Sequence, residues 1–140
     1  MDRVALLNSV VNRAEVLSGV APGSQDVDIS GFLKDPRNVM LGDERGVLLF
    51  IYSAKGVYDM HYLFTDALRG RNALQAARVA LHTLFTHYKA TAICGSTPRE
   101  NRAARAMNRA LGAVPFGEST DLLGRPCIDY VLEREKWAIS

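Results

Sequence analysis

The sequence has few of the features that mark several protein classes. Its 140 residues include only two cysteines, Cys94 and Cys127, and neither has a second cysteine or a histidine at metal-ligand spacing. We therefore expect no metal site and no disulfide framework. The longest apolar run, Val47–Tyr52, is far shorter than the roughly 20 residues that a membrane-spanning helix needs. The first residues lack the basic leader and apolar stretch of a signal peptide, which predicts a cytoplasmic protein.

Acidic residues are missing from one third of the chain. No acid occurs between Asp66 and Glu100, and the segment from Arg69 to Arg109 holds eight basic residues against one acidic residue. This imbalance predicts a positive surface that attracts an anionic ligand, and the alternative is a solvated basic face. Hydrophobic residues make up 48% and charged residues 23% of the chain, which is a globular composition. The length predicts one domain, residues 1–140.

Hydrophobic periodicity predicts an α/β fold. The expected elements are a helix over Asp2–Leu17, strands over Val39–Leu41, Val47–Ser53 and Val57–Phe64, a helix over Asn72–His87, a strand over Ala90–Gly95, a helix that starts at the capping box Thr97–Glu100 and ends at Leu111, and strands over Val114–Phe116 and Cys127–Glu133. The short links between the first three strands predict an antiparallel meander. The passage from Phe64 to Ala90 requires a parallel crossover, so the sheet should be of mixed direction.

The segment after the third strand has the composition of a phosphate-binding loop. Arg69 and Arg71 flank Gly70, and Asn72 is placed to cap the helix that follows. A helix start offers unpaired N–H groups and a partial positive charge, and glycine lets the backbone approach a ligand closely. The segment therefore predicts an anion site, although any helix after a basic loop shares these features.

Two segments resemble the GNAT acyltransferase superfamily, whose members bind acetyl-CoA. The segment Arg69–Leu74 stands where that family has Arg/Gln-x-x-Gly-x-Gly/Ala, and Asn101–Ala113 resembles its Asn-x-x-Ala…Gly-Phe segment. The likeness spans about Val39 to Glu133, and it is greatest to small GNAT-like proteins of tailed phages. It implies a single-domain GNAT-like sheet, in which an antiparallel meander is followed by a parallel crossover and helices flank both.

The resemblance also implies a cofactor site and marks departures from the family pattern. The backbone of Arg69, Gly70, Arg71, Asn72, Ala73 and Leu74 would hold the pyrophosphate of acetyl-CoA, Leu63, Phe64 and Thr65 would pair with its pantetheine arm, and Asn101 and Asn108 would line the cofactor. Asn72 and Leu74 stand where the family has small residues. Asn108 stands at the position of a tyrosine that many members use to protonate the departing thiolate, and a carboxamide cannot supply that proton near neutral pH.

Transfer of an acetyl group to an amine also needs a base, because the amine is protonated at pH 7. Asp59 and His61 are the candidates, since the two-residue period of a strand puts both on one face. The alternative is that they only form the polar face of a half-buried strand. Tyr88 and Tyr130 are the candidate substitutes for the missing acid, and the sequence does not choose between them.

Three hypotheses follow from these patterns. The first is an N-acetyltransferase-like protein that uses acetyl-CoA and transfers an acetyl group by direct attack of an amine on a small molecule or a protein. The second is a non-catalytic binding or assembly protein of the same fold, which Asn72, Leu74 and Asn108 favour. The third is a nucleic-acid binder that uses the arginines of the Thr97–Leu111 helix, and it ranks last because no aromatic stacking set accompanies them. No membrane partner is expected, and a homodimer is compatible with each hypothesis.

Overall fold

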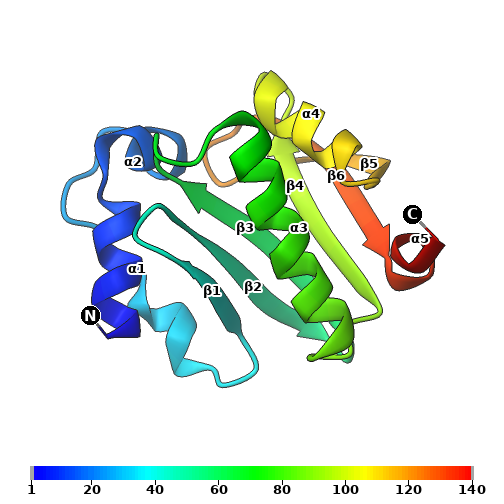
Figure 1. Cartoon of the computed structure of the whole chain (residues 1–140). Coiled ribbons are helices and arrows are strands. Elements are labelled where there is room, and N and C mark those ends of the chain that lie inside the picture. Colours follow the sequence, from blue (N-terminus) through cyan, green and yellow to red (C-terminus); the bar gives the residue numbers. More distant parts are fainter. Residues whose placement is uncertain (1, 140) are drawn as a thin grey trace. The chain divides into compact units, whose positions relative to one another are not determined.

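A computed structural model describes residues 2–139 of the chain (Figure 1). The elements are helices α1 Arg3–Val11, α2 Ala14–Val20, α3 Gly70–Thr86, α4 Arg102–Ala110 and α5 Arg134–Ile139, the 3-10 helix η1 Ser30–Lys34, and strands β1 Val39–Asp43, β2 Gly46–Ala54, β3 Val57–Phe64, β4 Ala92–Pro98, β5 Val114–Thr120 and β6 Pro126–Glu133. The predicted order of strands and central helices is confirmed. None of these described helices is long and apolar enough to cross a membrane.

The six strands form one mixed sheet in the order β1-β2-β3-β4-β6-β5. Strand β3 pairs in parallel with β4, whereas the pairs β1–β2, β4–β6 and β5–β6 are antiparallel. The sequence predicts that the passage from Phe64 to Ala90 crosses over between two parallel strands. These strands are β3 and β4, and α3 forms the crossover connection. This arrangement confirms the predicted fold class.

The chain divides into two compact units whose boundary cuts through β2, β3 and α3. The first unit comprises Met1–Tyr52 and His61–Ala80, and the second comprises Ser53–Met60 and Leu81–Ser140. The predicted phosphate-binding loop belongs to the first unit. Asp59, Asn101 and Asn108 belong to the second unit.

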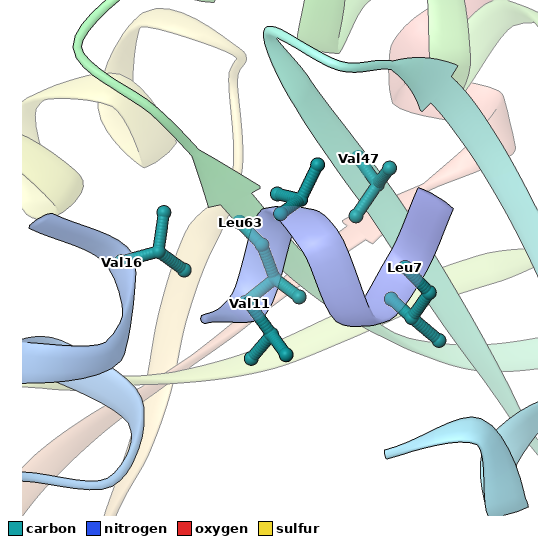
Figure 2. Close-up of a cluster of buried hydrophobic side chains, with 6 residues drawn as sticks. Leu7, Val11, Val16, Val47 and Leu63 are labelled. Atoms are coloured by element: carbon teal, nitrogen blue, oxygen red, sulfur yellow. The ribbon is translucent and has the colours of Figure 1, made fainter. Parts of the chain in front are cut away.

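The core of the first unit lies between its N-terminal helices and two strands. Figure 2 shows the side chains of this cluster, which come from α1, α2, β2 and β3: Leu7, Val10, Val11, Val16, Val47 and Leu63. The predicted single helix over Asp2–Leu17 is wrong, because the chain breaks into α1 and α2 at Asn12. The Asn12 side chain bonds to a loop that is distant in the sequence: it donates to the Val27 carbonyl at 2.8 Å and accepts from the Val27 N–H at 2.7 Å.

In the second unit, α4 starts later than the sequence predicts. Thr97 and Pro98 pair with Ile128 and Cys127 of β6, so they extend β4 and do not open a helix. The helix is capped by Asn101, whose Oδ1 accepts from the Ala104 N–H at 3.1 Å. The capping box at Thr97–Glu100 is therefore a wrong prediction, because the strand ladder outcompetes the local signal. The predicted stop at Gly112 is confirmed, since Gly112 follows α4 with a φ of +88°.

The buried face of α1 provides a test of the first core. Leu7 is 0% exposed and belongs to the cluster of Figure 2, so Leu7→Ala should lower the free energy of unfolding by about 2–5 kcal/mol. Val4 lies on the same helix at 45% exposure, and Val4→Ala should change that free energy by about 0.5 kcal/mol or less. Chemical denaturation measures both variants, and equal losses would contradict this packing.

Candidate functional site

The loop between β3 and α3 is held by one buried threonine. Thr65 is 1% exposed, and both its N–H and its hydroxyl donate to the Arg45 carbonyl, at 3.0 and 2.6 Å. The same hydroxyl oxygen accepts from the Ala67 N–H at 3.2 Å, and the Thr65 carbonyl accepts from the Leu68 N–H at 3.0 Å. The chain therefore leaves β3 in a fixed turn, which sets the direction in which α3 begins.

Helix α3 begins at Gly70, two residues before the predicted start. Gly70 has a φ of +57°, a conformation that side chains other than glycine adopt at a cost, and a Cβ at this position would meet nothing within 4 Å. Glycine is therefore required here by the backbone turn and not by crowding. The predicted cap at Asn72 is wrong, because Asn72 lies inside the first turn.

The first turn of α3 presents its backbone donors at this end. The Ala73 N–H donates to the Arg69 carbonyl at 3.5 Å, which is the first hydrogen bond of the helix. The N–H groups of Gly70, Arg71 and Asn72 precede that bond, and helix geometry gives such groups no partner within the helix. These three amides, and not that of Ala73, are the donors available to an anion.

The charges around this helix start are more balanced than the sequence suggested. Arg69 forms an exposed ion pair with Asp66, whose N–H donates to Glu15 Oε2 at 3.1 Å. The backbone N–H groups of Glu15 and Asp66 hold the pKa of the Glu15 carboxyl below its usual range. Arg71 is exposed and makes no ion pair with any residue in the described range 2–139. Arg71 is thus the clearest source of unpaired positive charge at this end of α3.

The residues expected to meet the pantetheine arm differ in burial. The side chain of Leu63 is 8% exposed and belongs to the hydrophobic cluster, and Phe64 is half-buried with its ring 5.4 Å from that of Tyr62. Ala73 is buried and Leu74 is half-buried on α3. The side chains of Leu63 and Thr65 are therefore largely inaccessible to a ligand.

Asp59 lies at the end of the short parallel ladder. The ladder joins Val57–Asp59 to Ala92–Cys94, with Asp59 opposite Cys94, although β3 and β4 continue to Phe64 and Pro98. Burial raises the pKa of the Cys94 thiol, and the charge of Asp59 raises it further. Asp59 is half-buried. His61, two residues farther along β3, is exposed.

Asn101 and Asn108 both have structural partners in the second unit. Asn101 caps α4, as described above. Asn108 is 6% exposed, and its Nδ2 donates to the hydroxyl of Thr97, itself 7% exposed, at 2.9 Å. Of the two tyrosines considered as acids, Tyr88 is 39% exposed and Tyr130 is buried on β6.

Arginines line a hollow on α4. The hollow has a volume of about 260 Å³ and is lined by Arg102, Arg105, Ala106 and Arg109. Arg105 donates to the Arg99 carbonyl at 3.0 Å, and Arg99 pairs with Glu118. The basic residues of the segment from Arg69 to Arg109 are therefore divided between the two units, and three of them gather on this helix.

Sequence reasoning missed a polar cluster that joins three strands of the second unit. Asp129 of β6 accepts hydrogen bonds from the hydroxyls of Ser96 on β4, at 2.6 Å, and Ser119 on β5, at 2.7 Å. These residues are far apart in the sequence and belong to no motif. Only the strand register, which sets Ser96 opposite Asp129, brings them together. No group of three metal-ligating side chains occurs within residues 2–139.

Solved structures of acetyltransferases share this fold. A chimera of the spermidine N-acetyltransferase SpeG from Vibrio cholerae and hSSAT superposes with a TM-score of 0.79 at 13% identity, covering 100% of this chain and 96% of that chain. A ribosomal-protein-S5-alanine acetyltransferase from Vibrio fischeri gives 0.73 at 12% identity, with 98% and 92% covered. A GNAT-family acetyltransferase from Bacillus anthracis gives 0.70 at 16% identity, with 94% and 89% covered.

These likenesses establish the fold of the chain as that of the GNAT acetyltransferases. No protein-family model matches the sequence, and no curated protein matches it significantly.

The contact between Asp59 and Cys94 can be tested by thiol reactivity. Because the thiolate is the reactive form and Asp59 raises the pKa of Cys94, Asp59→Asn should lower that pKa and speed alkylation by iodoacetamide near neutral pH by about twofold or more. The measurement uses a Cys127→Ala background. Glu133→Gln, which removes an exposed carboxylate from β6, serves as the control and should leave the rate unchanged. An unchanged rate in Asp59→Asn would place its carboxylate away from the thiol.

Proposed function

We propose that this protein binds acetyl-CoA and transfers its acetyl group to an amine. The observation that carries the proposal is the start of α3, where Gly70 is the first residue of the helix, has a φ of +57° and lies between two arginines in the sequence. This feature follows β3 in the first unit, within a fold shared with acetyltransferases.

The residues at the start of α3 fit a pyrophosphate. The N–H groups of Gly70, Arg71 and Asn72 precede the first helical hydrogen bond and point along the helix axis toward its N-terminal end. Arg71 adds a formal positive charge, and the open space beside the Gly70 Cα gives a ligand access to the backbone. The bulk of Asn72 and Leu74 leaves these amide donors in place. Asn101, Asn108, Leu63, Phe64 and Thr65 remain predicted contacts.

The proposed reaction is the direct transfer of the acetyl group. When bound, acetyl-CoA would supply an activated carbonyl, so that a C–N bond forms to the neutral amine and the C–S bond breaks. Counted from the ammonium form of the acceptor, the products are the N-acetyl amine, CoA thiol and one proton. The ammonium form has no lone pair and must first lose a proton. Asp59 and His61 are the proposed bases, because both lie on β3 and neither is fully buried.

The departing thiolate also needs a proton. Asn108 cannot supply the proton, and its carboxamide already donates to Thr97. This pair favours a second candidate function, a binding or assembly protein that keeps the fold and takes up the cofactor without turnover. Acetyl-CoA binding and amine-dependent release of CoA thiol, measured separately on the parent protein, distinguish the two functions. The phage-type likeness and the cytoplasmic location stay predictions.

The start of α3 gives a prediction for cofactor affinity. Arg71→Ala should weaken binding of acetyl-CoA by roughly 10- to 150-fold, because a charge-assisted hydrogen bond contributes about 1.5–3 kcal/mol. Arg69→Ala should have a smaller effect, since Arg69 already pairs with Asp66. Added salt should weaken binding to the parent protein, because exposed charges are screened.

The matched control is Arg78→Ala, which removes one exposed charge from the same helix two turns farther on. It should leave the dissociation constant, measured by calorimetry, close to that of the parent. Equal affinity in the parent and in Arg71→Ala would show that the Arg71 side chain takes no part in cofactor binding.

The two proposed bases are tested by rate. Asp59→Asn or His61→Ala should lower kcat with a responsive amine by roughly 100-fold, because general base catalysis contributes factors of this size, while acetyl-CoA binding persists. The lost rate should recover toward high pH, where more of the amine is already neutral. A variant that keeps the parental kcat at neutral pH removes that residue from the mechanism.

A further inference from the structure

The carboxylate of Asp129 is held in one orientation by two hydroxyls. Ser96 Oγ and Ser119 Oγ both donate to Oδ1, at 2.6 and 2.7 Å, and they approach from the two strands that flank β6. Hydrogen bonds of this kind fix a functional group before a ligand arrives. Both serines are exposed and Asp129 is half-buried, so the cluster lies at the surface of the sheet.

The second oxygen of Asp129 is left for a ligand. Within residues 2–139, no lysine or arginine forms an ion pair with Asp129, and both serine hydroxyls use Oδ1. Gly117 stands opposite Asp129 in the register, and a Cβ there would lie 3.8 Å from Oδ2. That distance is an ordinary van der Waals contact, so a side chain at position 117 would cover part of Oδ2, and glycine leaves this side of the oxygen open.

The cluster lies next to the end of the parallel ladder. Cys94 is the last residue of β4 that pairs with β3, and Ser96 follows it on the same face about 7 Å along the strand. Asp59, the proposed base, is the partner of Cys94 in that ladder. The open carboxylate oxygen and the proposed base therefore lie on one face of the sheet in the second unit.

We propose that Asp129 binds a positively charged nitrogen of the acceptor and so determines its class. The inference rests on the proposed acetyl transfer and names the substrate of that reaction. Ser96 and Ser119 orient the carboxylate, and Oδ2 accepts the N–H of an ammonium group. The cluster is thus a specificity site, and Asp129 takes no part in the transfer of the acetyl group.

The acceptor must carry a second amine. A nitrogen paired with a carboxylate is favoured in its charged form, whereas the nitrogen that attacks the thioester must be neutral. One nitrogen cannot satisfy both conditions at once. The acceptor therefore carries at least two basic nitrogens, one charged at Asp129 and another that reacts, and a diamine or polyamine is the simplest class of this kind.

The binding step is tested without turnover. Putrescine, a diamine, is titrated into the protein while the backbone amide signals of Ser96, Ser119 and Asp129 are followed by NMR. These signals should shift with putrescine and stay in place with butanediol, which has a similar length and no charge. Asp129→Asn should weaken putrescine binding by roughly 10-fold or more, since bonds to charged groups contribute most to such contacts. Glu133→Gln should bind putrescine as the parent does.

The melting temperature tests whether Asp129 has a purely structural role. The Asn side chain keeps an oxygen that accepts from both serines, so the melting temperature of Asp129→Asn should stay close to that of the parent. The proposal is overturned if putrescine leaves these amides unshifted, or if Asp129→Asn binds it like the parent. A thermal-shift titration with acetyl-CoA is run separately. Its failure alone would reject the proposed transfer, and the NMR result would still decide whether Asp129 binds an ammonium.

Where putrescine is acetylated, kinetics add a second readout. Asp129→Asn should raise the KM for putrescine by roughly 10-fold or more, with a small change in kcat and no change in the KM for acetyl-CoA, because only acceptor binding is lost. Ser119→Ala should have a weaker effect in the same direction, since the charge remains and only its orientation is loosened. A fall in kcat at constant KM would contradict the role of Asp129 in binding.

Discussion

The short parallel ladder between β3 and β4 is the constraint on which the rest of the structure depends. It joins only Val57–Asp59 to Ala92–Cys94, and parallel strands cannot be connected by a tight turn. The chain must therefore cross over through α3, and the left-handed backbone at Gly70 is where it turns into that helix. Strand β4 pairs with β6 over its whole length, Ala92–Pro98, which brings Ser96 opposite Asp129. The crossover through α3 follows from this pairing, and the Asp129 cluster follows from the ladders of β6 with β4 and β5.

The elements that sequence reasoning predicted correctly are those fixed by local constraints. The meander was accessible because the links around Asp43 and Lys55 are too short for any connection but a hairpin. The crossover followed from the length of the passage between Phe64 and Ala90, and the strand-to-helix position of Gly70 followed from its place after an apolar run. Hairpin length and apolar periodicity act over a few residues, so one sequence reveals them.

The features that were missed depend on partners distant in the sequence. The sequence at Thr97 has the local pattern of a helix cap. Thr97 and Pro98 nevertheless pair with β6, and Asn101 caps the helix. The break at Asn12 depends on Val27, and the ion pair of Asp66 offsets the charge of Arg69 that the sequence counted as available. The Asp129 cluster is assembled by the register of three strands. No pattern of residue types within one segment could have indicated it.

Asn108 has a role in the fold that does not depend on any reaction. Its bond to Thr97 joins α4 to β4 and satisfies two groups that are each more than nine-tenths buried, and leaving one of them unpaired would cost about 1–3 kcal/mol. The pair therefore stabilises the second unit whether or not any acetyl group is transferred. In the proposed function, a slow reaction would be traced to the missing acid at Asn108, whereas loss of cofactor affinity would be traced to the first turn of α3. With these proposed roles, the chain could lose turnover and keep binding, because different residues would serve each.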